Sequence, residues 1–194
     1  FVGSYLIEKM RSDKSLRELL QMVALMPMAI PGIVLGLAYI FFFNAKGNPL
    51  NFFYATMAIL VVNTIVHFYT VSHLSAITAI KKLDDEFESV SLSLKIPTYK
   101  MFFRVTLPVC LPTVFDIFIY LFCNAMTTVS GVIFLYTYDT TLASVSAIHL
   151  DEQGDVAGAA AMAMLIVYIS FVVRGLHTLI STLLLKRTQA WRNI

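Results

Sequence analysis

Long stretches without a charged residue are the feature that most constrains this chain. No Asp, Glu, Lys or Arg occurs from Leu19 to Ala45 or from Gly47 to Ile80. Two further stretches, Leu107 to Tyr136 and Val156 to Leu185, contain a single charge each. Each stretch exceeds the roughly 20 residues that cross the hydrocarbon core of a bilayer as a helix. The sequence therefore predicts an all-α membrane protein with four full spans, at about 19–43, 53–80, 107–136 and 156–185.

Composition and the first residues agree with this class. The chain is 58% hydrophobic and 13% charged, with a mean hydropathy of +0.78, far from the averages of soluble domains. It opens with the apolar run 1–7, which has no initiator Met and no basic segment before it, and so does not fit a signal peptide. We interpret this run as the tail of an earlier span. Residues 1–194 are then expected to form the C-terminal part of a single transmembrane domain.

Lys and Arg residues are distributed unevenly around the predicted spans. Twelve of the 14 lie before the first span, between the second and third, or after the fourth. The other two connecting segments, 44–51 and 137–155, contain only Lys46. Positive residues near span ends stay in the cytoplasm, so both ends of the chain are expected there. The net charge of +2 reflects this bias and, without a basic stripe interleaved with aromatic residues, excludes nucleic acid as a partner.

The first span contains several helix-disrupting or small residues. These are Pro27, Pro31, Gly32 and Gly36. Proline removes a backbone hydrogen bond and glycine permits close approach of another backbone, so a kinked and tightly packed helix is expected. A short amphipathic helix at about 11–21 is expected to lead into it.

Polar side chains within the spans are candidates for a translocation path or for contacts between helices. They are Asn63, His67, Asp116 and Arg174. Asn63 and His67 lie one turn apart on the same helix face. Polar groups inside lipid generally face protein or water, so both interpretations stay open for this pair.

Asp116 and Arg174 are isolated charges at comparable depths. Asp116 lies eight residues past Pro108, about 12 Å along a helix, and Arg174 lies twelve residues before Lys186, about 18 Å. An isolated charge in hydrocarbon is costly and needs a partner or water. We expect an Asp116–Arg174 ion pair between the last two spans. The alternative is that either residue lines an aqueous path.

Neither a metal site nor a cofactor is predicted. Cys110 and Cys123 both lie in the third span, on different helix faces, and are expected to be core residues. The segment His149 to Glu152 offers cation ligands, but a solvated acidic face is the favoured interpretation.

The segment 81–106, between the second and third spans, has a helical pattern of its own. Read at helical spacing, it carries an apolar stripe made of Leu83, Phe87, Val90 and Leu94. The first turn is acidic, as the helix dipole favours, through Asp84, Asp85 and Glu86. Pro97 ends this helix, and a second amphipathic stretch, 99–105, follows. Such helices outside a membrane core present an apolar stripe on which a soluble partner can dock.

Residues 88–108 resemble the EAA loop of binding-protein-dependent ABC importer permeases. That loop has an acidic residue, small residues, a glycine and then an aromatic and basic stretch ending in Leu-Pro. Lys95 stands where the family usually has glycine, and Val90 and Ser91 replace two alanines. The resemblance implies a type I importer permease in the bacterial inner membrane, whose loop is a coupling helix seated in a cytoplasmic ATPase. It implies this coupling role for Glu88, Ser89, Val90, Ser91, Leu94, Lys95 and Pro108.

The resemblance also implies the remaining partners. The expected partners are a cytoplasmic ABC ATPase, an extracytoplasmic solute-binding protein and a second permease copy or half, all around a lipid-embedded translocation path. The chain contains no G-x-x-x-x-G-K-[ST] phosphate loop, so ATP hydrolysis is assigned to the partner and the chain is expected to be a transporter subunit rather than an enzyme.

The substrate is predicted from short segments. Four of them are similar to the branch for 2-aminoethylphosphonate uptake, at 26–32, 105–112, 140–145 and 187–192. Phosphonate is the first prediction, and ferric iron or polyamine is the alternative, because those branches share parts of these segments. Two other classes are a passive channel and an intramembrane enzyme using Asp116, His67 and His177, which would lack any paired catalytic motif.

Overall fold

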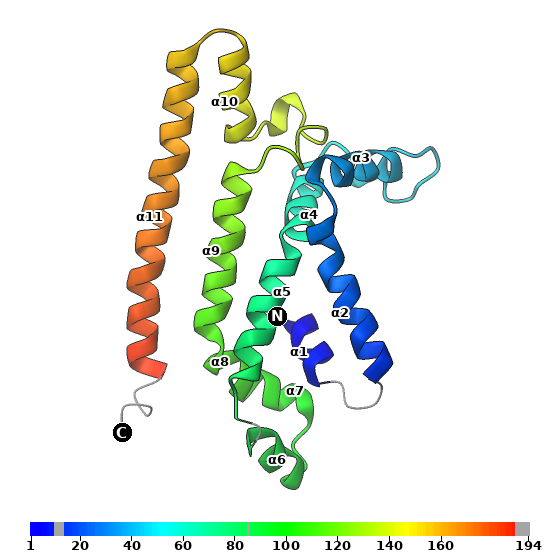
Figure 1. The fold of residues 1–194 in the computed structure, drawn as a ribbon, viewed down its shortest axis with the longest axis vertical. Helices are drawn as coiled ribbons and strands as arrows, with labels where there is room; N and C mark the ends of the chain where they lie inside the picture. Colours follow the sequence, from blue (N-terminus) through cyan, green and yellow to red (C-terminus); the bar gives the residue numbers. More distant parts are fainter. Residues whose placement is uncertain (10–13, 85, 189–194) are drawn as a thin grey trace.

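The molecule is a helical bundle whose two ends are formed by different helices. The computed structural model describes residues 1–9, 14–84 and 86–188, with side chains as far as residue 182, and no β-strand occurs in these ranges. The helices α6 (Glu86–Ser93) and α7 (Thr98–Met101) lie at one end, and α3 (Gly32–Phe43) and α10 (Ala143–Glu152) lie at the opposite end (Figure 1). This confirms the predicted all-α fold. It also places the two cation-poor connecting segments together, away from the cation-rich loop.

One helix can cross a membrane unaided. Within the described ranges this is α11 (Val156–Thr188), over the stretch Val156–Thr182. Three further crossings require a bent pair to act as one span. The pairs are α2 (Lys14–Ala29) with α3, bent by 105°; α4 (Met57–His67) with α5 (Tyr69–Lys81), bent by 54°; and Thr98–Val109 with α9 (Leu111–Thr127), bent by 72°. The four predicted spans therefore remain a prediction.

The predicted first span is two helices rather than one kinked helix. Pro31 has extended backbone angles, φ −57° and ψ 138°, and stands at the start of α3. Its ring disfavours helical geometry in the preceding residue, which ends α2. Pro27 lies inside α2, which also absorbs most of the amphipathic helix expected at 11–21. Residues 11–13 of that prediction lie outside the described ranges.

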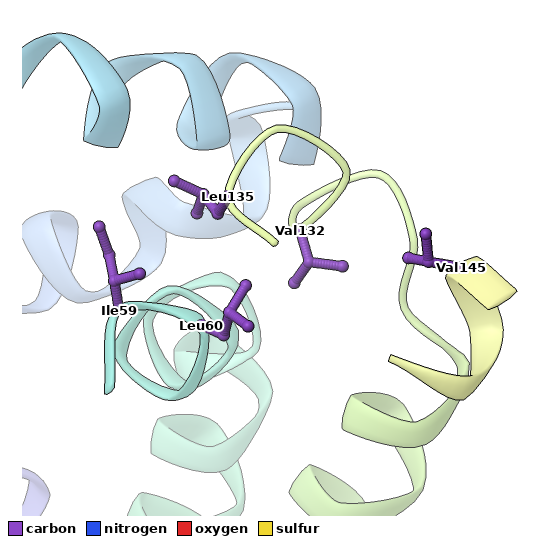
Figure 2. Close-up of a cluster of buried hydrophobic side chains, with 5 residues drawn as sticks. All are labelled: Ile59, Leu60, Val132, Leu135 and Val145. Carbon is purple, nitrogen blue, oxygen red and sulfur yellow. The ribbon is translucent and has the colours of Figure 1, made fainter. Parts of the chain in front are cut away.

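The predicted third span is too long at its far end. α9 stops at Thr127, and the apolar residues 128–136 form turns. Val132 and Leu135 from these turns pack in a buried cluster with Ile59, Leu60 and Val145 (Figure 2). A buried apolar turn and a lipid-facing helix have the same composition, so uncharged length alone does not show where the helix ends. The segment 137–155, expected to be a loop, contains α10, which packs along α11.

The remaining elements are short. α1 (Val2–Lys9) contacts α2 and α5. Turns of 3-10 helix occupy Asn51–Phe53 and Tyr138–Thr140. A π-helical segment, Phe102–Thr106, joins α7 to α8 (Leu107–Val109).

Candidate functional site

The start of α6 is set by an aspartate. The backbone N–H of Glu86 donates to Asp84 Oδ1 at 3.0 Å, which satisfies one of the unpaired donors at the helix start. The helix begins at Glu86, later than the apolar stripe alone suggested, with Glu86 and Glu88 as the acids of its first turn. Asp85 lies outside the described ranges.

The end of α6 is a Schellman turn. The N–H of Ile96 donates to Ser91 O at 2.9 Å, and the N–H of Lys95 donates to Leu92 O at 3.0 Å. In this motif the residue just after the helix end adopts a left-handed backbone conformation. That residue is Lys95, with φ +52°. Lys95 is the residue that stands where the family usually has glycine. The bend is thus kept without the residue type that favours it, at a cost of about 1–2 kcal/mol.

We expect Lys95→Gly to stabilise α6. Glycine adopts positive φ without steric cost, and after its larger loss of chain entropy the net gain is about 0.5–1 kcal/mol. Amide hydrogen exchange of α6 should slow by about two- to fivefold. Ser93→Gly is the matched control, because glycine inside a helix destabilises it and should speed the same exchange. Faster exchange in Lys95→Gly would contradict the assignment of strain to this residue.

The apolar stripe of α6 is exposed. Val90 and Leu94 are 56% and 66% exposed, Phe87 is also exposed, and Leu83 is half-buried. We call Phe87, Val90 and Leu94 the α6 stripe. A groove of about 820 Å³ runs beside it, between α6 and the helix Thr98–Val109, and is lined by Phe87, Val90, Met101 and Val105 together with basic side chains. This end of the molecule therefore offers an apolar ridge next to a mixed groove.

The other residues of the motif divide into two groups. Ser89 and Pro108 are exposed, like Lys95. Ser91 is buried, and Glu88 Oε1 lies 2.7 Å from Lys9 Nζ in an ion pair whose side chains are 16% and 19% exposed. Only part of the predicted coupling set thus faces outward.

Pro108 does not end a helix. The chain stays helical from Thr98 to Val109 and breaks at Cys110 instead. Pro108 lacks the N–H that an α-helix needs, and the wider π-helical turn at Phe102–Thr106 just before it is a common way to accommodate such an interruption.

Asn63 and His67 face the turns that follow α9. Asn63 is buried, and its Nδ2 donates to Gly131 O at 2.8 Å. A Cβ at Gly32 would lie 3.2 Å from His67 Cε1 and 2.8 Å from Ser130 Oγ. The shared face predicted for Asn63 and His67 therefore meets α3 and the 128–132 turns, where a Cβ at position 32 would be crowded.

Asp116 pairs with His177 in place of Arg174. Asp116 Oδ1 lies 3.2 Å from His177 Nε2, a distance at which the two attract when the imidazole is protonated, although the angle is not that of a hydrogen bond. Arg174, one turn earlier on α11, lines the same cavity of about 280 Å³. The predicted Asp116–Arg174 pair is corrected on this point. The depths estimated for Asp116 and Arg174 differ by about 6 Å, roughly one helical turn. His177 lies about one turn beyond Arg174 on α11, and so lies at nearly the same depth as Asp116.

Sequence reasoning missed the ion pairs of α1. Glu8 Oε1 lies 2.9 Å from Arg17 Nη2 and 3.9 Å from Lys81 Nζ, while Lys9 pairs with Glu88. The available signal was the adjacent pair of opposite charges, Glu8 and Lys9, directly after an apolar run. Lys9 was counted only as part of the uneven distribution of Lys and Arg, and Glu8 was not considered.

A bent helical bundle with an amphipathic loop at its cation-rich end fits an integral membrane protein. The family model described as binding-protein-dependent transport system inner membrane component matches residues 1–186. The chain belongs to this family of inner-membrane transport components.

Sequence relatives are ferric permeases. The ferric transport system permease protein FbpB of Actinobacillus pleuropneumoniae is 27% identical over 163 residues, covering 84% of this chain and 23% of that protein. A Haemophilus influenzae protein, provisionally named ferric transport system permease protein FbpB 1, is 32% identical over 130 residues, covering 67% of this chain and 20% of that protein. The chain thus spans about a fifth to a quarter of these relatives' length.

A solved structure shares the fold. It is a bacterial ABC transporter that imports the acidic polysaccharide alginate, with a TM-score of 0.73 at 16% identity, covering 93% of this chain and 70% of that one. At this identity the likeness concerns the fold alone. A second structure, that of the alginate transporter in complex with an alginate pentasaccharide-bound periplasmic protein, has a TM-score of 0.70 at 16% identity, covering 96% of this chain and 70% of that one.

Proposed function

We propose that this protein is the transmembrane permease subunit of an ATP-driven ABC importer, and that α6 docks into its cytoplasmic ATPase. The observation that carries the proposal is the exposed α6 stripe beside its groove at the cation-rich end of an inner-membrane transport component. An apolar helix face in water needs a partner. A helix seated in a groove is a common way to supply one.

The proposed partners follow from the family description. Binding-protein-dependent transport calls for a solute-binding protein on the outer side, as in the alginate transporter solved with its periplasmic protein. ATP hydrolysis is assigned to the docked ATPase, and a second permease copy or half completes the path.

Ferric iron is the better supported substrate. The relatives carry ferric transport names, which favours the alternative drawn from the sequence over the phosphonate placed first. Ferric iron is therefore our proposed substrate, and 2-aminoethylphosphonate is the second candidate. A hard trivalent cation is bound through oxygen ligands, which we assign to the external binding protein.

The polar residues in the spans receive different proposed roles. We assign Asn63 and His67 to packing of α4 against α3 and the 128–132 turns, because Asn63 is hydrogen bonded there. Asp116 is 62% exposed on the side of α9 that faces α11. A carboxylate at that depth needs water or protein over it, so a place at the path or under a partner subunit is proposed.

Cysteine labelling tests the side of the membrane on which α6 lies. In a background with Cys110 and Cys123 replaced by alanine, Lys46→Cys and Glu152→Cys should react with an impermeant thiol reagent added to intact spheroplasts, because the cation-poor end is expected outside. Ser93→Cys should stay protected until the membrane is opened. Lys46 is preferred over Asn48, whose side chain holds the turn by bonds to Phe42 O and Leu50 N.

Labelling of Ser93→Cys in intact spheroplasts would contradict the proposed function, since α6 would then lie on the side without the ATPase. The cysteine-free background reports non-specific reaction. Opened membranes show that each cysteine is reactive.

A further inference from the structure

The short helix α1 connects the α6 end of the molecule to two helices of the bundle. Figure 1 shows α1 among α2, α5 and α7, with α6 beyond it. Its last two residues carry opposite charges and contact different elements. Lys9 pairs with Glu88 on α6, whereas Glu8 pairs with Arg17 on α2 and lies near Lys81 at the end of α5.

Apolar packing fixes α1 against the same elements. Tyr5 is buried, and its ring centroid lies 4.8 Å from that of Phe102 in the loop. Tyr5 and Phe102 form a buried cluster with Ile80 of α5, against which Phe1 and Leu107 also pack. α1 is thus held between the loop and the end of α5 by buried side chains.

The two ion pairs are placed to resist separation. Lys9 and Glu88 are both mostly shielded from solvent, and so is Glu8. Attraction between charges grows as water is excluded, so each of these pairs attracts more strongly than a pair at the surface. Lys14 and Glu18, by contrast, lie 3.9 Å apart on the surface of α2 and are 91% and 66% exposed. An exposed ion pair of that kind contributes little to the stability of the folded protein.

We propose that Glu8 and Lys9 are positioning residues that make α1 a mechanical link, so that α6 and α2 move as one unit when the ATPase acts. This inference rests on the proposed docking of α6. Movement of α6 is passed from Glu88 to Lys9, and from Lys9 to the adjacent residue Glu8. Glu8 passes it to α2 through Arg17, and to the end of α5 through Lys81. The competing role for Glu88 is a direct contact with the ATPase, in which Lys9 would be a bystander.

Charge reversal distinguishes the two roles. The full-length permease, with its own ATPase, is placed in lipid nanodiscs with spin labels at Met22→Cys on α2 and Phe171→Cys on α11, both exposed positions, and with Cys110 and Cys123 replaced by alanine. The distance between the labels is measured with and without a non-hydrolysable ATP analogue. In the parent protein the analogue should shift this distance. Lys9→Glu and Glu88→Lys should each lose the shift while keeping the ATPase bound, and the double exchange should restore it.

Controls separate this link from folding and from docking. Lys14→Glu makes the same charge change in the exposed pair of α2 and should keep the shift. Lys9→Met removes the charge with little change in length and should also lose the shift, and an ATPase still bound to this variant shows that the permease is folded. A shift that persists in Lys9→Glu, or that the double exchange does not restore, would overturn the link.

Other outcomes are equally decisive. Loss of the bound ATPase in Glu88→Lys, with a normally folded permease, would assign Glu88 to the ATPase contact and overturn the link. No shift in the parent protein with the ATPase bound would overturn it as well. Failure of the parent protein to bind any ATPase would refute the proposed function instead.

Discussion

Replacing Val90 and Leu94 together by Asp should abolish co-purification of the ATPase while the permease still inserts into the membrane. Both side chains lie exposed on the α6 stripe and make no contribution to the buried clusters. Truncating an interface hot spot costs about 2 kcal/mol or more, and two carboxylates add the cost of burying charge. Two such losses amount to about 4 kcal/mol, or about a thousandfold in affinity. The ratio of ATPase to tagged permease after purification measures the effect.

Leu92→Asp is the matched control for this double variant. Leu92 is 58% exposed on the same helix, about 160° around it from Val90. It therefore receives the same chemical change off the stripe, and the ATPase should remain bound. Full retention of the ATPase by the Val90→Asp, Leu94→Asp variant would remove α6 from the docking role.

Deleting the gene for this subunit should abolish uptake of ferric iron by its transport system, a loss of tenfold or more, and leave growth on 2-aminoethylphosphonate unchanged. The physical reason is that the proposed path through the membrane disappears, which leaves the proposed binding protein and ATPase without a route for the solute. Uptake of radiolabelled ferric iron and growth on the phosphonate as sole phosphorus source are measured in one strain, under iron limitation and phosphorus limitation respectively.

A plasmid copy of the intact gene is the control and should restore iron uptake. The reverse pattern, normal iron uptake with failure to grow on the phosphonate, would favour the second substrate. Normal iron uptake and normal growth on the phosphonate, together with loss of polyamine uptake, would favour polyamine as the substrate. The assays separate the substrates without depending on the mechanism of coupling.

Much of the fold could be predicted from the sequence, because uncharged length is a strong signal for membrane helices. The breaks within the spans could not. Pro27 and Pro31 have the same chemistry, yet α2 continues through the first and ends before the second. The difference is tertiary, since α3 must place Gly32 against Ser130 and His67. Nothing within a few residues of either proline carries that information.

The candidate site divides in the same way. The α6 stripe was predicted by spacing alone and is exposed as expected, because helical periodicity is a local property. The pairing of Glu88 with Lys9 joins residues far apart in the chain, and only the packing of α1 brings them together. Arg174 was predicted as the partner of Asp116 because it is the other isolated charge at a comparable depth, and His177, which is charged only when protonated, was not considered as a partner.

The breaks have a mechanical consequence for the movement proposed for this bundle. Chain joints between α2 and α3, at Phe68 and at Cys110 divide three would-be spans into an inner and an outer segment. At each break the ladder of backbone hydrogen bonds that would keep the two segments in line is interrupted. α11 has no such joint along its 33 residues. The molecule therefore combines three bent helix pairs with one continuous helix, α11. Two of the bent pairs contain α2 and α5, the helices that α1 connects to the loop.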